Sequence, residues 1–211
     1  MSRAGVDRAL VYSTRTLSDA REGNQVLLEA TGNFTRLVPQ FVCNPATDRL
    51  DDFATEVSDR QVCSIRMFPA HHSYPFRDWA VESWLEWLAS ERLPLWIGAD
   101  EFDPSALHDT LKHRPDVTVV LCEVHYIHAP WATLLLKSLP NLYVELSCVV
   151  GSGGIATLLE TIGEERVLYG SRFPDSPMAP QLYNLHRSEL SEASLRAICS
   201  GNLDRLLSQG G

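Results

Sequence analysis

A charged side chain follows directly after a strand-like run near the end of the chain. The run 167–169 closes in a Gly170-Ser171 turn, and Arg172 and Asp175 come next. A planar guanidinium group binds carboxylate or phosphate groups through two parallel hydrogen bonds. This pattern predicts that Arg172 binds a small anionic substrate, with Ser171 and Asp175 in the same site.

Carboxylate and imidazole groups gather at the end of another strand-like run. Glu123 ends that run, and His125 and His128 follow within five residues. Together with Asp100, which follows the preceding run, they would form a nitrogen and oxygen ligand set suited to one zinc or manganese ion. The alternative is that these loop residues make ordinary hydrogen bonds. The same two interpretations apply to His71, His72 and Glu101.

Two interpretations of Glu123 and Arg172 are open, apart from both groups being solvated. Their charged groups form an ion pair within hydrogen-bond distance, or Arg172 binds the anionic group of a substrate. Arg66, near the end of the run 62–68, either forms a salt bridge to Asp100 or Glu123 or binds an anion. The predicted catalytic residues are Glu123, Arg172 and Asp175. The predicted substrate-binding residues are Arg66, Asp100, Ser171 and Arg172, and the predicted metal ligands are Glu123, His125 and His128.

Composition narrows the class of protein. The 211 residues carry 18 Lys and Arg against 27 Asp and Glu, a net charge of −9, and contain no basic run. Such a balance argues against a nucleic-acid partner. No run approaches the roughly 20 apolar residues of a membrane helix, and the first residues lack the apolar segment of a signal peptide. The five cysteines form no C-x-x-C pair, so we expect reduced thiols in a cytoplasmic protein.

Short apolar runs alternate regularly with longer amphipathic ones. Because the short runs are apolar on both faces, they predict parallel strands covered by helices. The expected strands are 9–13, 37–43, 62–68, 95–99, 117–123, 142–147 and 166–170. The expected helices are 23–31, 50–58, 79–92, 104–112, 131–139 and 154–162, with a last helix from Ser191 to about 207.

An alternating βα pattern builds either an open doubly wound sheet or a closed (β/α)₈ barrel. An open sheet would favour a glycine-rich loop after the first strand, and the segment 13–16 contains no glycine. The sequence therefore predicts an α/β fold of the TIM-barrel type with seven recognisable βα units. No linker or low-complexity tract interrupts the pattern, so residues 1–211 are expected to form a single domain.

Several of these segments resemble the amidohydrolase-related family of metal-dependent TIM-barrel hydrolases and decarboxylases. The segment 167–174 is similar to the Gly-Ser-Asp-x-Pro signature of the last barrel strand, and 198–207 resembles the closing helix of that family. Weaker likenesses in the segments 4–12, 36–41, 93–97 and 140–147 follow in the family's order. The resemblance implies a small carboxylate substrate and a divalent metal.

The chain departs from that family at the residues that would hold the metal. The resemblance places Gly98 and Glu123 where histidines would stand, and Arg172 where the catalytic Asp would stand. The strand carrying the family's His-x-His pair has no counterpart, so the first unit is expected to be lost or Met1 to be an internal methionine. Unpaired strand edges would then favour a homodimer.

Two functions from different classes remain. The first is an amidohydrolase-like hydrolase or decarboxylase that uses a rebuilt metal site or none. The second is a catalytically inactive barrel that serves as a binding or assembly subunit. A longer native chain with the missing unit is a third, weaker possibility, because it would not restore the family's residues at Gly98, Glu123 and Arg172.

Overall fold

The computed structural model describes residues 5–149 and 153–208. Its strands are β1 (Ala9–Val11), β2 (Leu37–Pro39), β3 (Phe41–Cys43), β4 (Ile65–Met67), β5 (Leu95–Gly98), β6 (Val119–Cys122), β7 (Leu142–Glu145) and β8 (Val167–Leu168). Its α-helices are α1 (Ala20–Thr31), α2 (Leu50–Asp59), α3 (Asp78–Ser90), α4 (Pro104–Leu111), α5 (Ala129–Ser138), α6 (Gly154–Ile162), α7 (Ala179–Arg187), α8 (Glu192–Arg196) and α9 (Asn202–Leu207). Short 3₁₀ segments, η2 (Thr14–Leu17) and η3 (Glu164–Arg166), precede α1 and β8, and a π-helical turn η4 (Ala197–Gly201) joins α8 to α9.

The strands are parallel and lie in sequence order. β1 pairs with β2, and β3 to β8 form one six-stranded sheet. β2 and β3 are two halves of the predicted strand 37–43, interrupted at Gln40. The Gln40 backbone N–H donates to the carbonyl of Val11 at 2.8 Å, and its side chain donates to Ser64 Oγ at 2.8 Å. The predicted α/β fold of the TIM-barrel type is confirmed, and among the described residues β1 and β8 do not pair to close it.

The two faces of the curved sheet pack against different elements. Side chains on the outer face, such as those of Leu95, Val119 and Val144, belong to the large core shared with helices. The inner-face residues Trp96 and Val120 alternate with them and form a second cluster. Because successive side chains of a strand point to opposite faces, both faces are apolar and buried.

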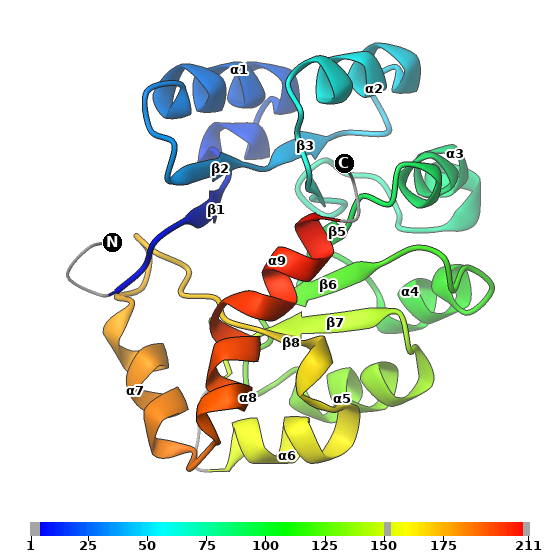
Figure 1. The fold of residues 1–211 in the computed structure, drawn as a ribbon. Helices are drawn as coiled ribbons and strands as arrows, with labels where there is room; N and C mark the ends of the chain where they lie inside the picture. Colours follow the sequence, from blue (N-terminus) through cyan, green and yellow to red (C-terminus); the bar gives the residue numbers. More distant parts are fainter. Residues whose placement is uncertain (1–4, 150–152, 209–211) are drawn as a thin grey trace.

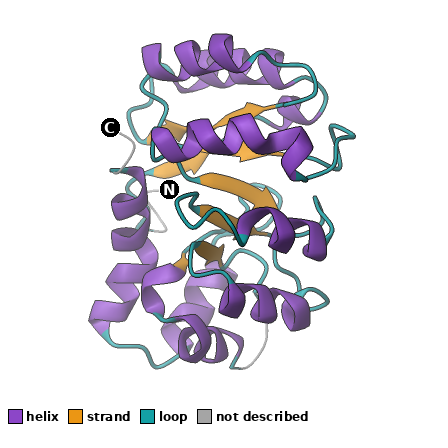
Figure 2. Cartoon of the chain, turned by 90° about the vertical axis from the view of Figure 1, so that its right-hand side faces the viewer, coloured by secondary structure: helices purple, strands orange, loops and turns teal. Residues whose placement is uncertain are grey.

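The C-terminal helix α9 covers the inner face of the sheet (Figure 1). Leu206 of α9 is 2% exposed and packs in one cluster with Trp96, Val120 and Leu168. Leu10 of β1 packs against the same cluster. Figure 2 shows the strands enclosed by helices when the molecule is turned by 90°. Helix α9 therefore fills space on the side of the sheet that a barrel interior would occupy.

Local capping explains several boundaries. The Asp103 side chain accepts the backbone N–H of Ala106 at 3.0 Å and Pro104 opens α4, as the sequence predicts. Ser191 caps α8 by accepting the backbone N–H of Ser194 at 3.1 Å. The predicted single last helix is wrong in one respect, because the π turn η4 divides it into α8 and α9. Helix α7 was not predicted.

None of the helices in the described ranges has the length and apolar character needed to span a membrane.

Candidate functional site

A buried arginine lies on the inner face of the sheet where the strands end, the side we call the mouth. Arg66 is the central residue of β4 and is only 5% exposed. Its guanidinium lies over the rings of Tyr12 and Phe68, with its Cζ 4.5 and 4.8 Å from their centroids. Its Nη2 donates to Glu123 Oε1 at 2.9 Å. The salt bridge to Glu123, one of the alternatives for Arg66, is formed.

Glu145, at the end of β7, holds the backbone around that pair. Its carboxylate accepts the backbone N–H groups of Glu123 and Ser147, each at 2.9 Å, and the Ser147 hydroxyl at 2.5 Å. Glu123 has a left-handed φ of 57°, which costs energy for a residue other than glycine. A Cβ at Gly170 would overlap Glu145 Oε2, so a larger residue at this position would force the carboxylate to move.

Arg172 lies in the segment after β8 and is loosely held. Its Nε is 3.8 Å from Asp175 Oδ2, its Nη1 is 3.9 Å from Cys148 Sγ, and its side chain is 37% exposed. Burial opposes the charged form of Arg172. The negative charge of Glu123 and contacts with other neighbours outweigh burial, so the pKa of Arg172 is raised. Burial raises the pKa of Tyr12, and the nearby Arg66 charge opposes this shift.

Glu123 and Arg172 do not form the ion pair that was one interpretation of the sequence. The Glu123 carboxylate pairs with Arg66 instead, and the nearest carboxylate to the Arg172 guanidinium is that of Asp175. The reason is the strand register, because β4 places Arg66 on the inner face and within reach of the end of β6. The Ser171 hydroxyl accepts the backbone N–H of Phe173 in a long contact of 3.4 Å.

Two of the predicted metal ligands, Glu123 and His128, pair with other charged side chains. His128 Nε2 is 3.1 Å from Asp100 Oδ1, and His128 Nδ1 accepts the backbone N–H of His125 at 3.3 Å. Glu123 forms an ion pair with Arg66, and a divalent cation that bound Glu123 would have to replace Arg66. Within residues 5–149 and 153–208, no three His, Cys, Asp or Glu side chains are grouped to hold a metal ion. Burial raises the pKa of the Cys122 thiol far above its usual range, so it offers no thiolate. In this arrangement Glu123 and His128 are paired with different protein groups and do not converge on one site.

A second charged pair lies on the loops that follow β4 and β5. Glu101 is 6% exposed, and its Oε1 is 2.5 Å from His71 Nδ1. Its Oε2 accepts the backbone N–H groups of Ala70 at 2.9 Å and of His71 at 3.3 Å. His71 and Glu101 are among the loop residues that the sequence offered for a substitute site, and the structure brings them together.

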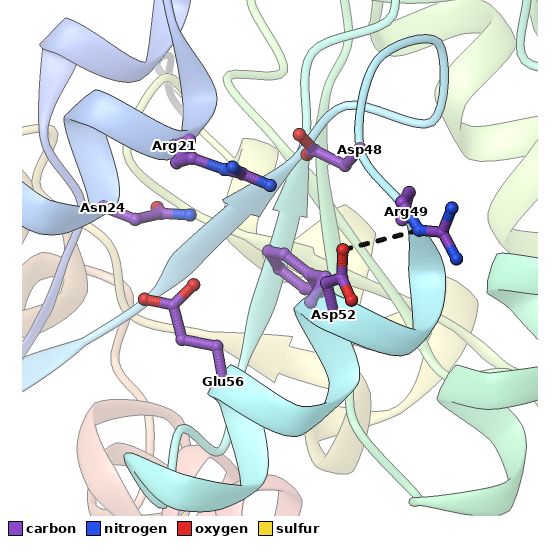
Figure 3. Close-up of a pocket in the computed structure, with 7 residues that line it drawn as sticks. Arg21, Asn24, Asp48, Arg49, Asp52 and Glu56 are labelled. Carbon is purple, nitrogen blue, oxygen red and sulfur yellow. Dashed lines mark ion pairs between the residues drawn. The ribbon is translucent and has the colours of Figure 1, made fainter.

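Two hollows border the strand ends without containing Arg66 or Arg172. The larger, about 390 Å³, lies between the loops after β4 and β5 and is lined by Ala70, Tyr74, Pro75, Phe76, Arg77, Asp100, Glu101, Phe102, Asp103 and Ala106. The other lies between α1 and α2, where the Arg21 side chain points toward α2 and Arg49 pairs with Asp52 at 3.4 Å (Figure 3). Of its charged groups, Arg21, Arg49 and Asp52 are exposed, and Asp48 and Glu56 are partly buried.

Three residues of the mouth were not predicted from the sequence. Tyr12 and Phe68 flank the Arg66 guanidinium, and Glu145 supports Glu123. A signal for Glu145 was present, because a carboxylate at the inward position of a buried strand requires hydrogen-bond donors. The aromatic pair carried no such signal, since aromatic residues at strand ends are common in any core.

Comparisons with known proteins agree with this architecture. A family model described as amidohydrolase matches residues 7–208. An uncharacterised TIM-barrel protein from Bordetella bronchiseptica superimposes with a TM-score of 0.83 at 15% identity, covering 100% of this chain and 81% of the other. The 5-carboxyvanillate decarboxylase from Sphingomonas paucimobilis gives 0.79 at 16% identity, covering 99% and 81%. The 5-carboxyvanillate decarboxylase from Novosphingobium aromaticivorans, solved with manganese and a nitrobenzoic acid, gives 0.79 at 14%, covering 97% and 77%. No curated protein matches the sequence.

Proposed function

Because this chain belongs to the amidohydrolase family, we propose that it binds a small carboxylate at the mouth of its single domain, without a resident metal. Arg172 is the group that binds the anion. Glu123 and Asp175 complete the site, and Ser171 and Arg66 border it. The single observation that carries the proposal is the loose engagement of the Arg172 guanidinium beside an ion pair that is already complete.

The charges at the mouth support a bound anion. Arg66 is neutralised by Glu123 at 2.9 Å, whereas Arg172 has its nearest carboxylate at 3.8 Å and keeps about a third of its side chain exposed. A partly desolvated guanidinium with free N–H groups binds carboxylates bidentately. Two structural relatives are decarboxylases of an aromatic carboxylate, so aromatic carboxylates are the first ligands to test.

Metal independence is part of the proposal. One relative was solved with manganese, and in such sites the ion polarises substrate oxygens and binds carboxylates. Here two guanidinium groups stand at the mouth, and a fixed positive charge repels a divalent cation. Arg172 would therefore supply the positive charge that binds the substrate carboxylate.

Isothermal titration calorimetry with benzoate and 2,6-dihydroxybenzoate tests the binding. Arg172→Gln should weaken binding about 10-fold or more, because a charge-assisted hydrogen-bond pair is lost. Arg60→Gln, on the exposed C-terminal end of α2, is the matched control. Addition of a chelator should leave the affinity unchanged. Equal affinity in the Arg172 variant, or no binding by the native chain, would contradict the proposal.

A catalytically inactive binding or assembly subunit is the second candidate. The favouring observation is that β1 and β8 each leave an edge unpaired among the described residues, and such edges favour association with another chain, including a homodimer. Sedimentation velocity over a range of concentrations distinguishes this role. A dimer that binds carboxylates but converts none of them would support it.

The cellular compartment is inferred from the thiols. All five cysteines are free, and Cys43 and Cys122 are fully buried. Reduced thiols at every cysteine are typical of the cytoplasm, where disulfides are rare. We therefore propose a cytoplasmic protein. Titration of free thiols in protein isolated from its natural source and then denatured should give five thiols per chain. A smaller number would contradict the assignment.

A further inference from the structure

His71 and Glu101 have the arrangement of a carboxylate-oriented base. The Glu101 carboxylate can only accept hydrogen bonds when it is ionised, and its two backbone donors stabilise that form. The contact of 2.5 Å therefore has His71 Nδ1–H as its donor. This tautomer leaves the lone pair of Nε2 free, and no group in the described ranges hydrogen bonds to Nε2. The His71 side chain is 52% exposed, so water reaches it.

The location of this pair connects it to the mouth. The His71 ring stands edge-on to the ring of Phe68, with centroids 5.9 Å apart. Phe68 in turn lies under the Arg66 guanidinium, which pairs with Glu123. On its other side, Glu101 lines the hollow of about 390 Å³. His71 is thus linked through Phe68 to the charged pair of the mouth and through Glu101 to that hollow.

We propose that His71 is a general base that activates water to hydrolyse an ester whose own carboxylate is bound by Arg172. The proposal rests on the proposed function, because the carboxylate anchor is the Arg172 site. An ester is the favoured substrate class, since a neutral imidazole acting without a metal suits a carbonyl with a good leaving group.

The reaction balances with water as the only co-reactant. His71 Nε2 takes a proton from water while the water oxygen forms a bond to the ester carbonyl carbon. The resulting tetrahedral intermediate collapses, and the bond from carbon to the alcohol oxygen breaks. The imidazolium returns its proton to the departing alkoxide, which leaves a carboxylic acid and an alcohol and restores neutral His71.

Glu101 acts through His71 and is a positioning residue. Its carboxylate fixes the Nδ1–H tautomer and stabilises the imidazolium that forms during the reaction. Replacement by Gln keeps the shape but supplies a neutral partner. A purely structural role for Glu101 would alter stability without a selective loss of kcat.

The test uses the mono-4-nitrophenyl esters of succinate, glutarate and adipate, which differ in the distance between carboxylate and ester. We expect the native chain to release 4-nitrophenolate faster than buffer with at least one of them. His71→Gln should lower kcat about 100-fold or more with little change in KM. Glu101→Gln should also lower kcat selectively, whereas Arg172→Gln should mainly raise KM. His113→Gln, at an exposed histidine, is the control and should match the native chain.

The outcomes separate the two proposals. If calorimetry shows free glutarate binding through Arg172 but no ester is hydrolysed above buffer, the His71 proposal is overturned and carboxylate binding stands. Hydrolysis that is unchanged in His71→Gln overturns it as well. Hydrolysis that depends on His71 but not on Arg172 would retain the base and overturn the carboxylate anchor. ¹⁵N NMR spectra of the His71 imidazole check the tautomer directly. They should show Nδ1–H in the native chain, and this tautomer should be lost in Glu101→Gln.

Discussion

Glu145 accepts the backbone N–H of Glu123 at 2.9 Å, so one carboxylate supports the residue that carries another. Glu145 is the last residue of β7, and Glu123 directly follows the neighbouring parallel strand β6. Glu145 is 5% exposed and is satisfied by hydrogen-bond donors from Glu123 and Ser147. The left-handed backbone at Glu123 thereby acquires a partner that offsets its cost. Glu123 is in turn available to pair with Arg66.

Replacing Glu145 by Gln should destabilise the protein. The amide offers one acceptor oxygen where the carboxylate offers two, and its NH₂ group would face backbone donors. We expect a loss of about 1–3 kcal/mol in the free energy of unfolding, measured by urea denaturation. Glu160→Gln, on the exposed side of α6, should change stability little. Equal stability of both variants would contradict the structural role of Glu145.

Gly170→Ala should destabilise the protein through a direct overlap. The added methyl would meet Glu145 Oε2, which cannot retreat without losing its backbone partners. Overpacking of this kind costs about 1–3 kcal/mol or more. Gly154→Ala is the control, because its methyl would lie 3.6 Å from Val149 in ordinary contact. The changes in the free energy of unfolding caused by Gly170→Ala and Glu145→Ala should be non-additive in a double-mutant cycle. Strictly additive changes would contradict the overlap.

Removing Arg66 alone should destabilise the protein more than replacing Arg66 and Glu123 together. Arg66→Met leaves the Glu123 carboxylate without its cation, and breaking one side of a buried pair costs about 3–5 kcal/mol. The partial exposure of Glu123, 25% of its side chain, reduces that cost. Arg66→Met combined with Glu123→Gln should recover part of the loss. Thermal and urea unfolding would measure this, and a double variant no more stable than Arg66→Met would contradict the pairing.

Stability should fall at alkaline pH. Burial raises the pKa of Cys43, Cys122 and Tyr74 well above ordinary values. In the unfolded chain these groups ionise near pH 8.5 for cysteine and about 10 for tyrosine. The native state binds more protons above those values, so the contribution is complete below about pH 8.5 and is lost as pH rises toward the folded pKa. Urea unfolding at neutral and alkaline pH measures the fall, which Cys122→Ala should reduce; a pH-independent stability would refute it.

The fold was largely predictable because its signals are local. Seven apolar runs predicted the strands, and α6 begins and ends at the predicted residues. The observed strands are shorter than predicted, since residues such as Ser13 and Glu123 leave the ladder to form loops. The break at Gln40 depends on a partner in β1, and the π turn before α9 depends on packing. Neither has a pattern that can be read from neighbouring residues.

The site was less predictable because its pairings are long-range. Glu123 and Arg66 were both identified, but the choice of Arg66 over Arg172 depends on which residue of β4 faces inward. His71 and Glu101 are 30 residues apart, and only the adjacency of β4 and β5 brings their loops together. Residue type predicted which groups can react, whereas strand register decides which of them meet.

The packing of α9 on the inner face has a consequence for synthesis. Leu206 and Leu10 contribute to the same cluster, and Arg8 pairs with Asp204 at 2.6 Å. Contacts between residues so distant in the chain form only after α9 has emerged from the ribosome. Until then, the inner face of the nascent sheet stays exposed to other hydrophobic surfaces. A ribosome-bound intermediate lacking α9 should therefore be the form that chaperones bind and proteases cleave.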